Sequence, residues 1–232
     1  MLEKMLKPLS LCLLVALIAG PISAQSGAIE LLEAMHARYY GKVCKAYSFS
    51  QRNTHYMADT VSGHSTWHER VSFPDRFTIF FGDTTKGNYV HFRNDSLFSY
   101  RHSELVKKGA DSNVLLLLLG GMYYRQLGDV VNRLKMAKYD FGKFSKQDWN
   151  GKPVYVLGAE KNDLNSNQFW VDAGTLVIVR IIEKMNADDW MDMRFESHQP
   201  LCGGYVENKV SFRRNGKLEQ LEEYYDVKET RE

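Results

Sequence analysis

Two histidines four residues apart, His64 and His68 in the segment HSTWHE, have a spacing that suggests a metal site. On a helix, this spacing places both imidazoles on one face and within reach of one ion. The surrounding residues alternate between apolar and polar types, however, and that alternation predicts a strand. Along a strand the two side chains share a face but lie about 13 Å apart, too far to bind one ion. We therefore expect two surface histidines and no metal site.

The sequence contains no motif typical of a catalytic centre. It lacks the Gly-x-Ser-x-Gly motif of hydrolases, the helical His-Glu-x-x-His motif, a P-loop and the glycine pattern of dinucleotide-binding folds. The acidic pairs Asp188-Asp189 and Glu222-Glu223 lie in turns or alternate across predicted strands, so we expect solvated charges rather than an acid–base pair. We predict that the protein is not an enzyme, with no catalytic residues and no cofactor.

The first 24 residues have the pattern of a secretory signal peptide. Two lysines precede the apolar stretch PLSLCLLVALIAG, and PISAQ follows, with Ala24 as the last residue before cleavage. The stretch is too short for a membrane anchor, which needs ~20 apolar residues. A lipoprotein interpretation of Cys12 is disfavoured because a leucine precedes it where a small residue is needed. We expect an exported protein in which residues 25–232 form a single domain.

The exported part of the chain is close to electrically neutral. Residues 1–24 hold two of the 30 basic and one of the 28 acidic residues, so 28 basic and 27 acidic residues remain. This balance, without a sustained basic stripe, gives no reason to expect nucleic acid as a partner. Two cysteines also remain, Cys44 and Cys202, in a protein that meets an oxidising compartment. They can form a disulfide or stay apart as buried thiols, because two cysteines alone fix no geometry.

Helical spacing appears in three places. The first predicted helix is capped at Ser26 and ends near Gly41. Its apolar residues fall on one face: Ala28, Leu31, Leu32, Met35 and Tyr39. Farther along, Asp111 or Ser112 can cap a helix that carries five consecutive leucines, and Gly120-Gly121 then ends or bends it. A third helix follows, with Leu127, Val130, Val131 and Leu134 on one face and an Asp129–Arg133 pair.

Elsewhere the apolar period is two, which predicts antiparallel strands joined by short turns. The alternating segments are residues 45–51, 65–73, 75–83, 88–95, 96–102, 140–160, 167–172, 175–184, 190–197 and 206–227. Asn-Gly pairs at 150–151 and 215–216 are the strongest short hairpin signals. We count about eleven strands. So many short strands predict a barrel or a strongly curved sheet, with internal space that other elements must fill.

The leucine run allows two interpretations. Residues 114–119 are too few to span a bilayer. They can cover the mouth of an apolar hollow in the curved sheet, or they can be ordinary core into which no ligand enters.

Taken in order, several segments resemble the LolA-like periplasmic carriers of outer-membrane lipoproteins. The segments are AYSFSQ, FPDRFTI, HFRNDSLFSY, LLLLLGG and QFWVDAGTLVIVRI, after an exported amphipathic helix. In that family the helix precedes a strand ending in Phe-x-Gln, a Pro-x-x-Phe strand, a hairpin, a leucine-rich lid and a Trp-x-Asp hairpin. The resemblance covers most of the exported chain. It implies a mainly β (α+β) fold, an unclosed antiparallel β-barrel with an α-helical lid over an apolar hollow that accepts acyl chains.

Three positions depart from the family pattern. Family members have an arginine, tied to lid closure and cargo handling, directly before the proline of the Pro-x-x-Phe strand. Here that residue is Phe73, and the nearby Arg70 is predicted to face the other way, so the role is not transferred. The first hairpin has residues 94–96 (Asn-Asp-Ser) in place of Asp-Gly, and the second has residues 176–177 (Leu-Val) where proline is common.

The leading hypothesis is a periplasmic carrier that holds lipid or lipoprotein acyl chains in an apolar cavity. Exposing a 16-carbon chain to water costs on the order of 12 kcal/mol, at ~0.8 kcal/mol per methylene, and only an enclosed apolar cavity offsets that cost. Strand alternation and the leucine-rich segment give the candidate lipid-binding residues. They are Tyr47, Phe49, Trp67, Phe77, Ile79, Phe92, Phe98, Tyr100, Leu115, Leu116, Leu119, Met122, Met191, Met193 and Phe195.

The alternative hypothesis is a cell-envelope scaffold or protein-interaction module that has the same fold and carries no lipid. For a carrier, the family resemblance implies an inner-membrane release transporter and an outer-membrane acceptor as partners. In either case we expect a monomer.

Overall fold

The computed structural model describes residues 24–231. The predicted signal peptide, residues 1–24, lies outside this range except for Ala24, which is the first residue of helix α1. None of the helices in residues 24–231 is both long enough and apolar enough to cross a membrane.

The described chain is mainly strand, with a few short helices. In chain order the elements are α1 (Ala24–Tyr39), β1 (Ala46–Met57), β2 (Thr60–Ser72), β3 (Arg76–Phe81), the 3-10 helix η1 (Thr84–Lys86), β4 (Tyr89–Arg93), β5 (Ser96–Arg101), β6 (Glu104–Ala110), α2 (Val114–Leu118), the 3-10 helix η2 (Gly121–Tyr124), α3 (Leu127–Met136), β7 (Phe144–Trp149), β8 (Lys152–Leu157), β9 (Gln168–Asp172), β10 (Ile178–Asn186), β11 (Asp189–Glu196), β12 (Gln199–Leu201), β13 (Gly204–Val206), β14 (Lys209–Arg214) and β15 (Lys217–Glu229).

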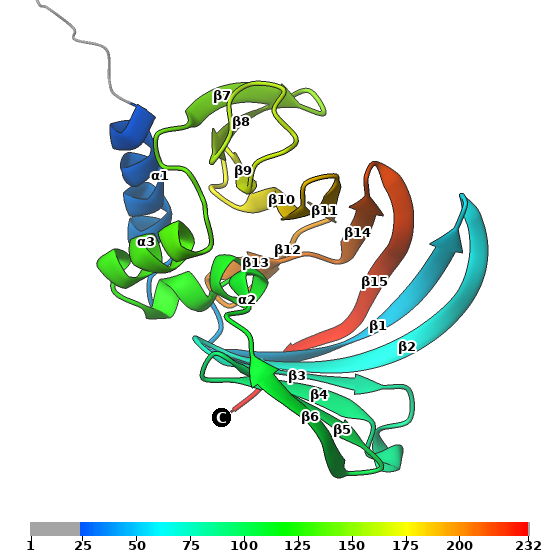
Figure 1. Ribbon diagram of the computed structural model, residues 1–232. Coiled ribbons are helices and arrows are strands. Elements are labelled where there is room, and N and C mark those ends of the chain that lie inside the picture. Colours follow the sequence, from blue (N-terminus) through cyan, green and yellow to red (C-terminus); the bar gives the residue numbers. More distant parts are fainter. Residues whose placement is uncertain (1–23, 232) are drawn as a thin grey trace, which may run out of the picture.

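Thirteen of these strands form one antiparallel sheet in the order β6-β5-β4-β3-β2-β1-β15-β14-β11-β10-β9-β8-β7, and β12 and β13 pair separately. The sheet curves strongly between its two edge strands, β6 and β7, which do not pair with each other (Figure 1). Helices α1, α2 and α3 lie together on one side of this curve (Figure 1). The predicted fold class, an unclosed antiparallel β-barrel with a helical lid, is therefore confirmed.

The Asn-Gly pairs form the predicted hairpin turns. Asn150 and Gly151 have φ angles of 53° and 75° between β7 and β8, and Asn215 and Gly216 have 50° and 81° between β14 and β15. Positive φ at both central residues defines the type I′ turn, whose twist matches that of the flanking strands. Asparagine and glycine adopt this region at low cost, which explains why the sequence alone locates these turns.

The described chain has more strands than the predicted eleven, with thirteen in the large sheet and two, β12 and β13, in a separate pair. Strand β6 is exposed along nearly its whole length and is rich in charge, so it shows no apolar alternation. Strands β12 and β13 have three residues each, too few to establish a period. Strand β6 is held by its pairing with β5 rather than by burial of one face.

The main core lies between α1, α3 and the β7–β11 half of the sheet. The predicted apolar face of α1 is confirmed, because Ala28, Leu31, Leu32, Met35 and Tyr39 are all buried. The helix begins two residues before the predicted cap. Its Ser26 hydroxyl instead donates a hydrogen bond to the Glu30 carboxylate (2.7 Å).

The predicted pattern of α3 is also confirmed. Val130 and Leu134 are fully buried in the core, and Leu127 and Val131 pack against it. The Asp129–Arg133 pair forms at 3.1 Å. Helix α3 thus extends the core that α1 begins.

Candidate functional site

A cavity of about 390 Å³ lies between the lid helix α2 and the strands β1–β4, β11, β14 and β15. We call it the lid cavity. Its wall is largely apolar, and eleven of the fifteen candidate lipid-binding residues line it. They are Tyr47, Phe49, Trp67, Phe77, Ile79, Phe92, Leu115, Leu116, Leu119, Met191 and Phe195. Aromatic and β-branched side chains from the strands thus face leucines from the helix across one space.

Two further aromatic candidates, Phe98 and Tyr100, were wrongly assigned to the cavity and lie on the opposite face of the sheet. Across the β4–β5 pair, Leu97 stands opposite Phe92, so Leu97 shares the cavity face. Phe98 stands opposite His91, and Tyr100 stacks on the outer face with its ring centroid 4.4 Å from that of Tyr89. A shift of one residue in register exchanges the two faces of a strand.

The remaining candidates, Met122 and Met193, also do not line the lid cavity. Both are buried in the main core, with exposed fractions of 0% and 4%. Met193 lies on the same face of β11 as Met191 and Phe195, but it packs into the core cluster that contains the α1 residues. The helices therefore fill part of the concave face, and the cavity is the part that they leave open.

The lid segment, residues 113–124, is positioned by local hydrogen bonds and by two glycines. The Asn113 side chain accepts a hydrogen bond from the Leu116 backbone N–H (2.8 Å) and caps α2, rather than the predicted Asp111 or Ser112. The Gly120 Cα lies directly against the Phe73 ring, and a methyl group there would overlap it. A methyl group on Gly121 would lie 2.8 Å from the Pro74 carbonyl oxygen. Both glycines are thus needed for close approach.

Two longer-range contacts hold the chain at and beyond the end of the lid segment. The Tyr124 hydroxyl donates a hydrogen bond to the Val43 carbonyl oxygen (2.6 Å) just before β1. On α3, Arg133 donates two hydrogen bonds to the carboxylate of Asp95 in the β4–β5 turn, at 2.9 and 3.3 Å. Helix α2, which has only five residues, precedes both contacts in the chain.

Phe73 occupies the position at which the family pattern has an arginine. Its side chain is 3% exposed and packs with Tyr47 and Leu116. Its ring stacks against that of Tyr124, with the centroids 6.1 Å apart. In this chain, an apolar contact with the lid therefore occupies the position at which the family pattern has an arginine.

Three glutamates that sequence reasoning did not select also line the lid cavity. Glu69, Glu207 and Glu222 are only 5%, 8% and 5% exposed. Glu222, predicted to be solvated, is therefore buried, whereas its neighbour Glu223 is exposed. In a strand, every second residue lies on the same face, so Glu69 shares a face with Trp67 and Val71. This spacing was the one signal in the sequence that could have located Glu69.

Burial raises the pKa of all three carboxyl groups. It raises the pKa of Glu207 and of Glu222 to about 7, and it raises that of Glu69 well above its usual value, with a further increase from the two neighbouring glutamates. Glu222 accepts hydrogen bonds from the Tyr224 hydroxyl (2.9 Å) and the Gln220 amide (2.7 Å), which limit its increase. Desolvation favours the neutral form of a carboxyl group.

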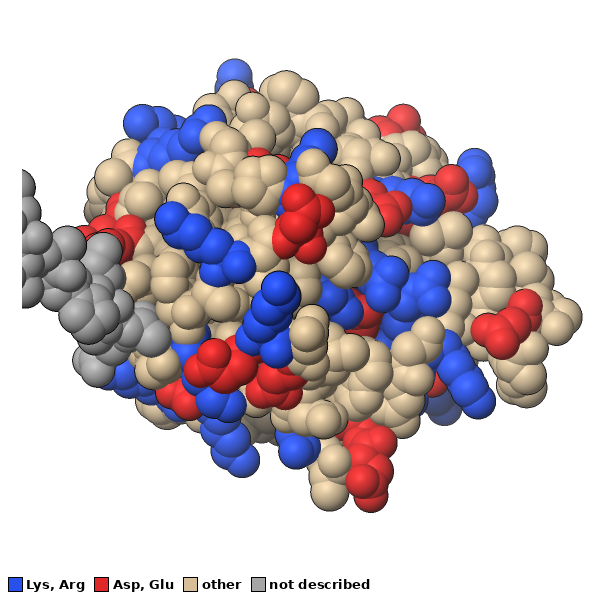
Figure 2. Space-filling view, turned by 90° about the horizontal axis from the view of Figure 1, so that it is seen from above, with Lys and Arg blue, Asp and Glu red and all other residues tan. Residues whose placement is uncertain are grey.

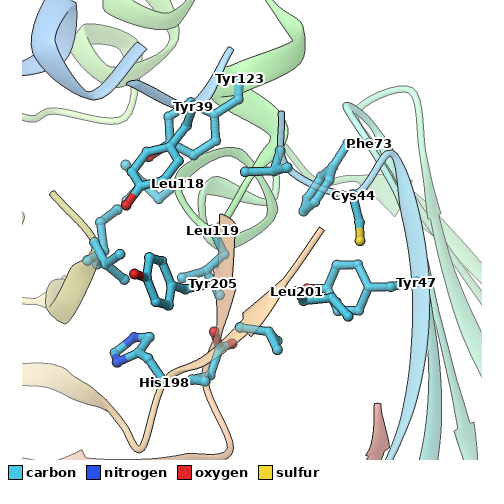
Figure 3. Close-up of a pocket in the computed structure, with 15 residues that line it drawn as sticks. Tyr39, Cys44, Tyr47, Phe73, Leu118, Leu119, Tyr123, His198, Leu201 and Tyr205 are labelled. Atoms are coloured by element: carbon cyan, nitrogen blue, oxygen red, sulfur yellow. The ribbon is translucent and has the colours of Figure 1, made fainter. Parts of the chain in front are cut away.

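A smaller pocket of about 50 Å³ adjoins the lid cavity and shares Tyr47, Phe73, Leu119 and Glu207 with it. Figure 3 shows Tyr39 and Tyr123 on its helix side and Tyr47 on the side of the long strands. Glu207 lines both spaces and therefore lies between them.

Cys44 and Cys202 form a disulfide beside this pocket, with their Cα atoms 5.3 Å apart. The bond joins the segment before β1 to the β12–β13 turn, which is 158 residues away in the chain. The disulfide therefore attaches the start of strand β1 to the turn that comes before β13 and Glu207.

His64 and His68, whose spacing first suggested a metal site, form hydrogen bonds with residues of the neighbouring strand β1. His68 forms a hydrogen bond with the Ser50 hydroxyl (2.8 Å), and His64 forms one with Thr54 (3.3 Å).

Charged side chains of both signs are interspersed over the molecular face seen in Figure 2. That face therefore offers no single-sign patch for a polyanion.

Comparison with known proteins gives a result at the level of structure. No family model and no curated protein sequence matches the chain. A DUF1329 family protein from Desulfovibrio piger is similar with a TM-score of 0.59 and 13% identity, covering 89% of this chain and 93% of that one. A LolA superfamily protein from Nitrosomonas europaea has a TM-score of 0.55 and 11% identity, covering 88% and 94%.

A third solved structure is titled as a putative outer membrane lipoprotein-sorting protein domain from Vibrio parahaemolyticus. It has a TM-score of 0.58 and 11% identity, and the match covers 88% of this chain and 92% of that one. At such identities a likeness establishes the fold alone. The open sheet, the helical lid and these likenesses together show that the chain has the LolA-like fold.

Proposed function

We propose that this protein is a periplasmic carrier that holds the acyl chains of a lipoprotein or another lipid in the lid cavity and is not an enzyme. The observation that carries this proposal is a largely apolar cavity of about 390 Å³ lined by strand aromatics and lid leucines. Transfer of a 16-carbon chain out of water is worth on the order of 12 kcal/mol, which an apolar enclosure can supply. Two of the similar structures are titled as LolA superfamily and lipoprotein-sorting proteins.

The wall of the cavity suits a cargo that must leave again. Leucine and methionine side chains from α2 and β11 adapt to chains of different shape without a fixed hydrogen-bond pattern. The short helix α2 and its C-cap residue contact the cavity through Leu115, Leu116 and Leu119, so displacement of this segment would widen the space. By resemblance, the partners of such a carrier are an inner-membrane release transporter and an outer-membrane acceptor.

The first test is to identify what the protein carries. The exported protein is purified from cells without detergent, extracted with solvent, and the extract is analysed by mass spectrometry. A carrier yields lipid at close to one molecule or acyl set per protein. A clean extract, together with no binding of a neutral long-chain fluorescent probe, would instead support a scaffold that keeps the fold without cargo.

A substitution in the lid tests whether the cavity is the binding site. Leu116→Glu places a charge among apolar cavity residues and should abolish loading, because burying an unpaired carboxylate costs several kcal/mol. Leu105→Glu is the matched control, since Leu105 is 53% exposed on the edge strand β6. Equal lipid content in both variants, measured by the same extraction, would separate the lid from cargo binding.

A further inference from the structure

The polar part of the lid cavity is built from three carboxyl groups on separate elements. Glu69 is on β2, Glu222 is on β15, and Glu207 follows β13. Each is more than nine-tenths buried, and Glu69 is within electrostatic reach of the other two. Three carboxyl groups gathered in an apolar space are costly for the empty protein, because burial and mutual repulsion both disfavour their ionised forms.

Nothing in the described chain neutralises these groups. No lysine, arginine or histidine within residues 24–231 forms an ion pair with any of the three. By contrast Glu219, a fourth acidic residue of the cavity wall, is paired with Arg214 at 3.1 Å.

Two buried amide side chains near the glutamates also have atoms without a hydrogen-bond partner. Gln51 and Asn53, both 0% exposed on β1, leave the Gln51 Oε1 and Asn53 Nδ2 atoms without partners. The Asn53 Oδ1 atom accepts a hydrogen bond from Gln220, the residue that also donates to Glu222. Neither Gln51 nor Asn53 lines the lid cavity, but both are linked to it through Gln220, which does. Because buried polar atoms are nearly always paired in folded proteins, this polar network has capacity for a further hydrogen-bonding group.

We propose that Glu69, Glu207 and Glu222 bind the cationic headgroup of an amphiphile, an ammonium group, while its hydrocarbon chain lies against the aromatic and leucine wall. This inference rests on the proposed carrier function and names the class of its cargo. An ammonium group offers three donors and a positive charge, which match carboxylate acceptors that have no cation of their own. A carboxylate or phosphate headgroup would meet like charge at the same place.

The geometry also implies that binding depends on pH. The other titratable groups facing the glutamates are Tyr47 and Tyr224, whose pKa values are raised well above 10 by burial, so both stay neutral between pH 5 and 8. The hydrogen bond to the Glu219 carboxylate raises the pKa of Arg214, which therefore stays cationic in that range and is already paired. Ionisation of Glu207 and Glu222 near pH 7 therefore controls the affinity for a cation, which is higher at pH 8 than at pH 5.

The test compares three single-chain amphiphiles of one chain length with the intact, delipidated protein at pH 8. Dodecylamine is cationic, dodecanol neutral and dodecanoic acid anionic, and each displaces a neutral fluorescent probe below its micelle concentration. We expect dodecylamine to bind about tenfold or more tightly than dodecanol, and dodecanoic acid to bind least well. At pH 5 the preference for the amine should fall to about threefold or less as the glutamates protonate.

Variants assign the preference to the cluster. Glu69→Gln retains the shape of the side chain and should lower amine affinity about tenfold while leaving dodecanol binding unchanged. Glu223→Gln, at an exposed neighbour of Glu222, is the control and should change neither affinity. If Glu69→Gln does not fold, as judged by thermal unfolding, Glu207→Gln tests the same cluster.

The two proposals fail in different ways. If none of the three amphiphiles binds, the carrier function itself is wrong. If all three bind with equal affinity at pH 8, or if the amine preference survives Glu69→Gln and Glu207→Gln, the cavity is a lipid site and the headgroup inference is overturned.

Discussion

At the scale of single residues, the unusual feature is acidity inside an apolar space. Glu207 has no side-chain hydrogen bond among the causes of its raised pKa, which burial alone raises from 4.5 to about 7. A carboxyl group whose pKa is higher in the folded than in the unfolded state binds protons more readily when folded. Its favourable contribution is complete below pH 4.5 and is lost as the pH rises through 7.

The delipidated protein should therefore be less stable at pH 8 than at pH 5. Replacing Glu207 with Gln removes one of the groups that loses its proton and should raise the free energy of unfolding at pH 8, by on the order of 2 kcal/mol. Urea unfolding at both pH values measures this. The exposed Glu223→Gln variant should show the full pH dependence, and a Glu207→Gln variant that matches wild type at pH 8 would contradict the burial argument.

At the scale of elements, the lid depends on a contact between backbone and ring. Gly120 has no side chain, and this allows the Phe73 ring to pack directly on its Cα. The contact joins the end of the lid helix to the segment between β2 and β3, beside the cavity. We infer that this contact sets how closely α2 covers the cavity.

A methyl group at Gly120 should therefore displace the lid. Gly120→Ala is expected to cost about 1–3 kcal/mol of stability through overpacking and to weaken retention of a bound chain. The cost should largely disappear in a Phe73→Ala background, which makes room for the methyl group. Gly128→Ala in α3, where nothing lies within 4 Å, is the control and should be neutral or stabilising. Additive costs of Gly120→Ala and Phe73→Ala would show that the two residues do not interact.

The sequence predicts an element well when its own pattern carries the information. The apolar face of α1 and the Asn-Gly turns follow from local spacing, and both appear in the structure as predicted. Strand β6 is different, because it is a polar edge held only by its pairing with β5. The errors at Phe98 and Tyr100 arise because alternation gives two faces for β5 but does not say which one points inward; pairing across the β4–β5 turn decides that.

The same limit explains what was missed in the cavity. Alternation places Glu69 with Trp67 and Val71, but only the curvature of the whole sheet buries it together with Glu207 and Glu222. Met193 shows the converse, since its strand face was predicted correctly while the covering helices could not be positioned from the sequence.

At the scale of the whole molecule, one covalent bond ties distant parts of the open sheet. The Cys44–Cys202 disulfide closes a segment of 158 residues, next to a sheet whose two edges do not pair. Replacing both cysteines with serine should lower the free energy of unfolding by about 2–5 kcal/mol, because the unfolded chain gains freedom. Unfolding of oxidised protein, reduced protein and the double variant measures this. Similar stability of all three would show that the hydrogen-bonded sheet holds this region without the bond.

The central claim is that hydrocarbon enters the lid cavity, and Trp67 reports on it directly. Trp67 lines the cavity, whereas Trp149 and Trp170 pack against each other elsewhere and Trp190 does not line it. Bromine quenches tryptophan fluorescence only at close range, so an alkyl chain carrying bromine should produce saturable quenching in the wild-type protein. In the Trp67→Phe variant, which keeps an aromatic wall, that quenching should be nearly absent. Quenching of equal size in both proteins, or none in either, would contradict the account.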